Sequence, residues 1–422
     1  MLKPIFTFLA ASLLLVGTAS AETVKLALID PLTGPMAAAG QPAFEHLKYE
    51  AKRINANGGL NGQDLEIVGL DNKVNPQESL VQLQKAIDDG VRYVTQGNGS
   101  SVASALISAI EKHNQRNPGE EVLYLNYAAV DPAFTNERCS YWHFRFDANA
   151  DMKMNALTDH IAANDDIKKV YLINQDYSFG QAVSKAAREM LKEKRPDIEI
   201  VGNDFHPLAK VKDFTPYVSK IQSSGADAVI ETAHRMGIKS DLVDNASIAL
   251  GTSEVSLLVK AAAEFGLEAP FFTYYGASSG VVTQLGDKGV DRIYQINEYY
   301  GEFEDPEMAK RQTELYEQAE WDFYYLRLST MLDMLKKSAD QAKSTDPVDF
   351  AKALGGMKLE TTTGEVVMRA EDHQIQLPMF ISVMKDDMEY GAEGTDYNFK
   401  KVARIDREAV SLPTTCRMRR PK

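Results

Sequence analysis

From about residue 23 onward the chain alternates between two hydrophobic patterns. Short apolar runs rich in Val, Ile and Leu, typical of buried strands, are separated by longer stretches whose apolar residues recur every three or four positions, as in amphipathic helices. Up to residue 127 the alternation predicts four strands with three helices between them. The predicted strands are 23–30, 64–71, 91–97 and 121–127, and the predicted helices are 40–55, 75–90 and 100–113.

The same alternation starts again near residue 168. Strands bounded by helices imply parallel sheets covered on both faces, so two such series predict two doubly wound α/β domains. The second series has predicted strands 168–174, 198–205, 226–233 and 270–275, and predicted helices 180–193, 214–225 and 253–266.

Beyond the second series the pattern is less regular. A long helix is predicted over residues 322–342, and strands are predicted within 364–387. Residues 237–252 fit neither pattern, and this stretch is longer than the connections that usually join such elements.

The first 21 residues have the layout of a secretory signal peptide. A basic residue, Lys3, precedes an apolar core and the small residues Ala19, Ser20 and Ala21. The apolar run is short for a membrane span, so we expect export and cleavage after Ala21, into the periplasm.

Charge and cysteine content narrow the function further. The chain has 46 basic and 60 acidic residues, a net charge of −14, which argues against nucleic acid as a partner. The basic tail, 416–422, is read as a solvated terminus. The two cysteines, Cys139 and Cys416, predict one disulfide in an oxidising compartment, with two buried free thiols as the alternative.

Motifs for catalysis are sparse. The phosphate-binding pattern G-x-x-x-x-G-K-[ST] and the zinc pattern H-E-x-x-H do not occur. Residues 276–280, GASSG, match the G-x-S-x-G elbow of serine hydrolases, with Ser278 as nucleophile and His373 as the single downstream histidine. His234 has no Cys or second His nearby to suggest a metal site. We therefore predict no catalytic residue, no metal and no cofactor, and keep the hydrolase as a weak alternative.

Small, hydroxyl-bearing loops follow several predicted strands. In open parallel sheets, ligands bind beyond the carboxyl ends of the strands. Two such domains facing each other would enclose a cleft lined by loops from both. These loops are 97–101, 126–131, 174–180 and 274–280.

Six motifs in order along the chain resemble the leucine/isoleucine/valine-binding type of periplasmic solute-binding protein, which serves ABC importers. The resemblance implies the type I fold: two doubly wound Rossmann-like lobes joined by a three-crossover hinge. It places lobe 1 at 22–144 plus 299–375, lobe 2 at 145–298 plus 376–405, and a C-terminal tail at 406–422. The motifs are PLTGPMAAAG (31–40), INANGGLNG (54–62), GNGSS (97–101), NYAAVDPAFT (126–135), DYSFG (176–180) and TTTGEVVMRAEDHQ (361–374).

The resemblance also implies ligand contacts. Ser100 and Ser101 stand where the family holds a ligand carboxylate at a helix N-terminus, where unpaired N–H groups favour an anion. Ala128 matches a backbone contact, and Phe179 matches an aromatic position that closes from lobe 2. The full set of expected ligand-binding residues is Ser100, Ser101, Asn126, Ala128, Val130, Asp176, Tyr177, Phe179, His234 and Tyr275.

The chain departs from the family in the loop 274–280. Amino-acid binders place a glutamate there for the ligand ammonium, and this loop has no acid, although Asp176 or Glu231 could substitute. Ala39, where relatives can carry an aromatic, predicts a larger pocket. We therefore expect a hydrophobic or branched-chain amino acid, or a related small carboxylate or amide. The expected partner is an inner-membrane ABC permease and the expected state a monomer; a ligand sensor that docks to a signalling receptor remains the alternative.

Overall fold

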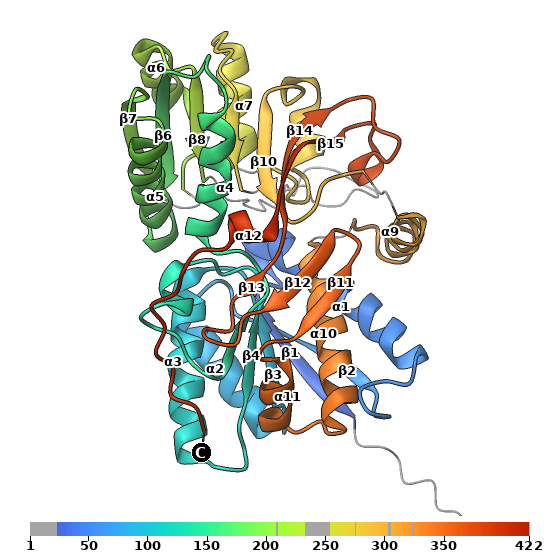
Figure 1. The fold of residues 1–422 in the computed structure, drawn as a ribbon. Helices are drawn as coiled ribbons and strands as arrows, with labels where there is room; N and C mark the ends of the chain where they lie inside the picture. Colours follow the sequence, from blue (N-terminus) through green and yellow to red (C-terminus); the bar gives the residue numbers. More distant parts are fainter. Residues whose placement is uncertain are drawn as a thin grey trace, which may run out of the picture.

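The computed structural model describes residues 23–207, 210–232, 254–274, 276–302, 305–322 and 325–421. Two α/β units lie one above the other in Figure 1, each built on its own sheet, and several segments run between them. None of the helices in these ranges is long and apolar enough to cross a bilayer.

The first sheet has five parallel strands in the order β2-β1-β3-β4-β5. Its strands form because their apolar runs are buried on both faces: in β1, Leu26, Ala27, Leu28 and Ile29 are fully buried. The strands are β1 Val24–Asp30, β2 Leu65–Asp71, β3 Tyr93–Gln96, β4 Leu123–Asn126 and β5 His143–Arg145. The connecting helices are α1 Ala37–Ala56, α2 Pro76–Asp88 and α3 Ser100–Arg116, and the 3-10 turns are η1 Gly34–Met36 and η2 Pro132–Thr135.

The second sheet has seven strands in the order β15-β14-β10-β9-β8-β6-β7. Its β7-β6-β8-β9-β10 part is parallel and repeats the order of the first sheet, while β14 and β15 add two antiparallel pairings at one edge. The strands are β6 Lys169–Gln175, β7 Glu199–His206, β8 Ala228–Glu231, β9 Phe271–Thr273, β10 Ile293–Asn297, β14 Met379–Lys385 and β15 Asn398–Ile405. The helices are α4 Ala150–Ala162, α5 Ser178–Lys194, α6 Thr215–Ser224, α7 Glu254–Glu264 and α8 Val281–Leu285, with the turns η3 Gly286–Lys288 and η4 Ala392–Gly394.

The helix predicted over 322–342 is shorter than expected. It begins at Leu326, because the residue before it, Tyr325, has an extended backbone (φ −150°, ψ 132°). Asp322 therefore lies outside the helix. The remaining elements are α9 Pro306–Ala319, α10 Leu326–Ala342, α11 Pro347–Leu354, the antiparallel strands β11 Lys358–Thr361, β12 Gly364–Met368 and β13 Ile375–Gln376, and α12 Arg407–Val410.

Three segments connect the two units: β5 to α4, β10 to α9, and β13 to β14. The second segment returns to the first unit, because both α9 and α10 contact α1. Gln374, just before β13, donates through Nε2 to the carbonyl of Asp147, 2.7 Å away on the first segment. The Gln374 side chain thus links the segment before β13 to the connection between β5 and α4. The exact lobe boundaries remain predictions.

A buried group of four charged side chains lies at these connections, and we call it the hinge cluster. It consists of Asp147, Lys153, Glu298 and Arg327. Arg327 Nη1 lies 2.6 Å from Asp147 Oδ1 and 3.0 Å from Glu298 Oε2, so it joins the first connection to the second. Lys153 Nζ lies 2.8 Å from Asp147 Oδ2. Each carboxylate of the hinge cluster therefore faces a cation.

The C-terminal tail runs from the second unit back to the first, as the red trace in Figure 1 shows. After β15, α12 contacts both α4 and β13. The predicted disulfide Cys139–Cys416 is present, with Cα atoms 5.7 Å apart. Thr414 Oγ1 also donates to the carbonyl of Thr135 at 2.7 Å, and Arg369 Nη1 donates to the carbonyl of Leu412 at 2.7 Å. The tail is therefore a further link between the units, fixed covalently.

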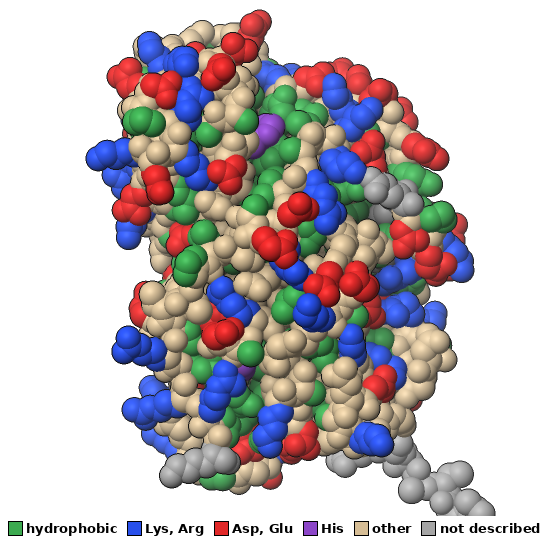
Figure 2. All heavy atoms as spheres, in the orientation of Figure 1, with side chains coloured by type: hydrophobic (Ala, Val, Ile, Leu, Met, Phe, Trp, Pro, Cys, Tyr) green, Lys and Arg blue, Asp and Glu red, His purple; other side chains and the backbone are tan. Residues whose placement is uncertain are grey.

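On the face drawn in Figure 2, basic and acidic side chains are interspersed. Lys and Arg do not gather there into one continuous patch, so this face offers no basic track for a nucleic acid backbone.

Candidate functional site

The candidate site lies where the carboxyl ends of the two sheets meet. Helix α3 begins directly after β3, and α5 begins directly after β6, and the two helices contact each other. Because each helix starts at the carboxyl edge of its own sheet, we infer that the first turns of the two helices lie at this contact. Ser100 is buried at the first position of α3, and Ser101 beside it is exposed.

Asp30, at the carboxyl end of β1, organises the loop in front of Ser100. Its buried carboxylate accepts hydrogen bonds from the backbone N–H groups of Gly97 (3.3 Å) and Asn98 (3.1 Å), and from the hydroxyl of Tyr127. Burial raises the pKa of Asp30 to about 6. Sequence reasoning missed this residue, although a single acid that ends an apolar strand just before a loop was a usable signal.

Asn126 closes the turn after β4. Its Oδ1 accepts from the amides of Ala128 (3.1 Å) and Ala129 (2.8 Å), and its Nδ2 donates to the Ala129 carbonyl at 2.8 Å. The amide of Ala128, expected as a ligand contact, is thus engaged within its own turn. Val130 is buried, and its carbonyl accepts from the amide of Ala150 at 2.9 Å, which ties the turn to α4.

Aromatic side chains from the second unit pack beside the start of α5. The ring of Phe179 lies 5.9 Å from that of Tyr177 and 6.0 Å from that of Tyr274. Tyr274 donates its hydroxyl to the carbonyl of Ala150 at 2.9 Å. Asp176 is exposed and accepts from Gln181 Nε2 at 3.0 Å. The structure therefore brings Tyr177 and Phe179 together and leaves Asp176 at the surface.

The other sequence candidates divide into three groups. His234, Tyr275 and residues 237–252 lie outside the described residues. Glu231 is buried at the end of β8. Ala39 is buried in α1, and its carbonyl accepts from Asn98 Nδ2 at 3.3 Å, so it abuts the loop before α3.

The hydrolase alternative gains no support from the surroundings of Ser278. This side chain is buried, and its hydroxyl lies 3.5 Å from that of Tyr325. His373 is instead stacked against Phe144, with ring centroids 3.9 Å apart, and burial lowers its pKa to about 3. Within the described ranges the serine and the histidine have separate neighbours, and no group of three or more potential metal ligands occurs there.

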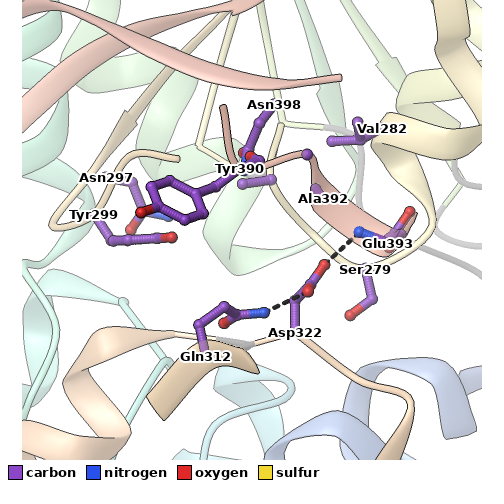
Figure 3. A pocket seen from close by; sticks show the side chains of 12 residues that line it. Ser279, Val282, Asn297, Tyr299, Gln312, Asp322, Tyr390, Ala392, Glu393 and Asn398 are labelled. Carbon is purple, nitrogen blue, oxygen red and sulfur yellow. Dashed lines mark hydrogen bonds between the residues drawn. The ribbon is translucent and has the colours of Figure 1, made fainter. Parts of the chain in front are cut away.

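A cavity of about 610 Å³, including its part open to solvent, lies beside the loop 276–280. We call it the Asp322 pocket. Figure 3 shows Asp322 and Gln312 on one side, with Tyr390, Ala392 and Asn398 on the other. The twelve lining residues are Ala277, Ser279, Val282, Asn297, Tyr299, Gln312, Asp322, Tyr390, Gly391, Ala392, Glu393 and Asn398.

The Asp322 pocket joins both units, and sequence reasoning missed it. Its lining comes from four segments: the loop 276–280 with the start of α8, the end of β10 with the connection after it, the segment from α9 to Asp322, and the β14–β15 connection with the start of β15. None of the lining residues is Lys, Arg or His.

The fold fits one known family. A model of the family described as periplasmic binding protein matches residues 23–389. The chain belongs to this family. A relative in Brucella melitensis, described as "Leu/Ile/Val-binding protein homolog 4", is 30% identical over 421 residues, 97% of each chain. The sequence-based prediction of a solute-binding protein of the type I fold is thereby confirmed.

Two solved structures share this fold. The leucine-, isoleucine-, valine-, threonine-, and alanine-binding protein of Brucella ovis, in a closed conformation, superposes on this periplasmic binding protein with a TM-score of 0.81. It is 28% identical, and the match covers 95% of this chain and 100% of that one. A solute-binding protein of an ABC transporter from Rhodopseudomonas palustris BisB5, in complex with 3,4-dihydroxy benzoic acid, has a TM-score of 0.73 at 20% identity, covering 91% and 98% of the chains. The latter likeness shows the fold alone.

Proposed function

We propose that this periplasmic binding protein captures a small organic solute with a carboxylate between its two lobes and delivers it to an ABC permease in the inner membrane. Branched-chain and other hydrophobic amino acids are the first candidates. The mature protein acts in the periplasm, after removal of residues 1–21.

The observation that carries this proposal is the match along nearly the whole chain to a Leu/Ile/Val-binding protein homolog. The contact between α3 and α5 supports it, because residues expected to hold the ligand lie at the first turns of both helices. The N-terminus of α3 offers unpaired backbone N–H groups and a dipole that favour a carboxylate. Phe179 and Tyr177 supply apolar surface from the facing unit.

Aromatic carboxylates form a second ligand class to test. The solved structure from Rhodopseudomonas palustris holds 3,4-dihydroxy benzoic acid, and two tyrosines, Tyr177 and Tyr274, pack beside Phe179 in this chain. An aromatic acid has no ammonium group and so needs no acidic residue as a counter-charge. The loop 276–280 contains no such residue.

A thermal-shift screen tests the proposal. The panel contains leucine, isoleucine, valine, threonine, alanine, 4-methylpentanoate and 4-hydroxybenzoate. A ligand at a hundred times its Kd stabilises the folded state by about 2.7 kcal/mol, which raises the unfolding temperature measurably. We expect at least one hydrophobic amino acid to do so. A panel that leaves the transition unmoved, while isothermal titration detects no binding heat either, contradicts the proposed function.

A further inference from the structure

The loop 276–280 lacks an acid of its own, but two carboxylates lie beside it. Glu393 accepts hydrogen bonds from the backbone N–H of Gly280, from the N–H of Thr283 at 3.3 Å and from the hydroxyl of Thr283. Asp322 in turn accepts from the backbone N–H of Glu393 at 2.6 Å. These bonds connect the end of the loop, the β14–β15 connection and the segment before α10.

In the part of the chain that the structure describes, both carboxylates bond to neutral groups. Asp322 uses one oxygen for Glu393 N–H and the other for Gln312 Nε2, as the dashed lines of Figure 3 show. Glu393 accepts hydrogen bonds from the backbone N–H groups of Gly280 and Thr283 and from the Thr283 hydroxyl. A carboxylate has about four lone-pair sites, so Asp322 retains capacity for a donor that enters the pocket.

The surroundings of Asp322 disfavour its ionised form, so a nearby positive charge would stabilise it. Burial raises the pKa of Asp322 to about 6, and the charge of Glu393 adds to this rise. Within the described residues, the charge of Asp322 also acts on Tyr299 from the connection after β10 and on Tyr316 from α9, and neither of these groups is a cation. A cation in the pocket would compensate two partly desolvated carboxylates at once.

We propose that Asp322 binds the cationic amine of the transported solute, in place of the acid that the loop 276–280 lacks. The inference rests on the proposed function and deepens it: the solute carries an amine as well as a carboxylate. Ala277 and Ser279 bring the loop to the pocket wall, and Tyr299 and Tyr390 offer ring surface to the rest of the solute. Asp176, the acid favoured by sequence proximity, is exposed and bonded to Gln181.

Isothermal titration on the full mature chain tests the inference. The probes form two matched pairs, L-leucine with 4-methylpentanoate and 4-aminobutyrate with butyrate, which differ within each pair by the amine. We expect the amine-bearing member of at least one pair to bind more than about tenfold tighter than its partner, the usual size of a charged hydrogen bond. Asp322→Asn should remove this difference. Glu389→Gln, which removes one charge from an exposed position in the same connection, should preserve it.

The outcomes separate the two proposals. If 4-methylpentanoate, butyrate or 4-hydroxybenzoate binds as tightly as the amine-bearing probes, the proposed function stands and the inference is wrong. An amine preference that survives in Asp322→Asn also overturns it. If no probe binds and no compound of the thermal-shift panel binds either, both proposals are wrong.

The pH profile gives a readout that does not depend on the variant's fold. In the wild type, affinity for the amine-bearing probe should fall more steeply than affinity for its amine-free partner as pH drops below about 6 and Asp322 takes up a proton. Asp30, whose pKa is also about 6, would affect both probes alike. A flat profile between pH 5 and 8 would contradict the inference.

Discussion

The hinge cluster and the Asp322 pocket both hold partly or fully buried carboxylates, yet their electrostatics differ. In the hinge cluster, Asp147 and Glu298 share Arg327, and Asp147 also faces Lys153. In the pocket, Asp322 and Glu393 contact amides and a hydroxyl. The first arrangement neutralises its own charge, whereas the second leaves a negative field in a cavity.

Because of this difference, we assign the hinge cluster a structural role and the Asp322 pocket a role in ligand binding. Burial lowers the pKa of Lys153 and raises that of Glu298, a cost that the opposite charges offset only while every member is present. The hinge cluster therefore holds the connections between the lobes together. In the pocket, burial likewise raises the pKa of Asp322, and no cation among the described residues offsets this cost, as expected of a site that binds a cationic ligand.

The largest effect is expected for Arg327→Met. The change leaves Asp147 and Glu298 buried with Lys153 as the remaining cation, so the free energy of unfolding should fall by about 3–5 kcal/mol. Urea unfolding followed by fluorescence measures it. The matched control on the same helix is Lys336→Met, which breaks an exposed pair with Asp340 and should cost less than about 1 kcal/mol. Equal effects of the two changes would contradict a structural role for the hinge cluster.

Cys416→Ser comes next. The disulfide closes a segment with a sequence separation of 277, so its loss should lower the free energy of unfolding by about 2–4 kcal/mol through the gain in entropy of the unfolded chain. The same urea titration measures the loss, and reduced wild-type protein should reproduce it. An unfolding midpoint that neither reduction nor substitution shifts would show that the tail contributes no stability.

Asp322→Asn should act in the opposite direction. Because folding raises the pKa of Asp322 from 3.8 to about 6, its contribution to stability is present below pH 4 and is lost as pH rises through 6. The neutral amide avoids this loss, so at pH 7.5 the unliganded variant should be more stable by about 1–2 kcal/mol. Asp30 supplies a slope of the same sign that remains in the variant. A variant less stable than the wild type at pH 7.5 would indicate that Asp322 stabilises the fold rather than binding the ligand.

Ser278→Ala should have the smallest effect. The distance of 3.5 Å between its hydroxyl and that of Tyr325 corresponds to a weak hydrogen bond, so stability should change by less than about 1 kcal/mol. Ligand affinity by isothermal titration should stay within about threefold. Loss of hydrolysis of an ester such as 4-nitrophenyl acetate on this change would revive the hydrolase alternative.

The α/β architecture could be predicted because apolar runs such as β1 are buried on both faces. Helix α4 was harder, since its buried residues include Met152, Lys153 and Met154 in succession and leave no clear stripe. In α9 only Met308, Ala309 and Leu315 are buried, which gives a weak hydrophobic signal. Long, strongly patterned elements are thus visible in the sequence, and elements that depend on tertiary contacts are not.

Prediction of the site from the sequence has the same limit. Motifs indicated Ser100 and Phe179, because loops at the carboxyl ends of strands have recognisable residue types. The Asp322 pocket is assembled from four separate segments, and its key contact joins Asp322 to Glu393, 71 positions apart. Neither acid has a local pattern that marks it, so only the folded chain shows that they meet beside the loop 276–280.

A crystal structure with the tightest amine-bearing probe tests the central claim most directly. The account predicts the amine nitrogen within hydrogen-bonding distance of the Asp322 carboxylate. An amine that points to Asp176, to Glu231 or to solvent, with Asp322 still bonded only to Gln312 and Glu393, would contradict it.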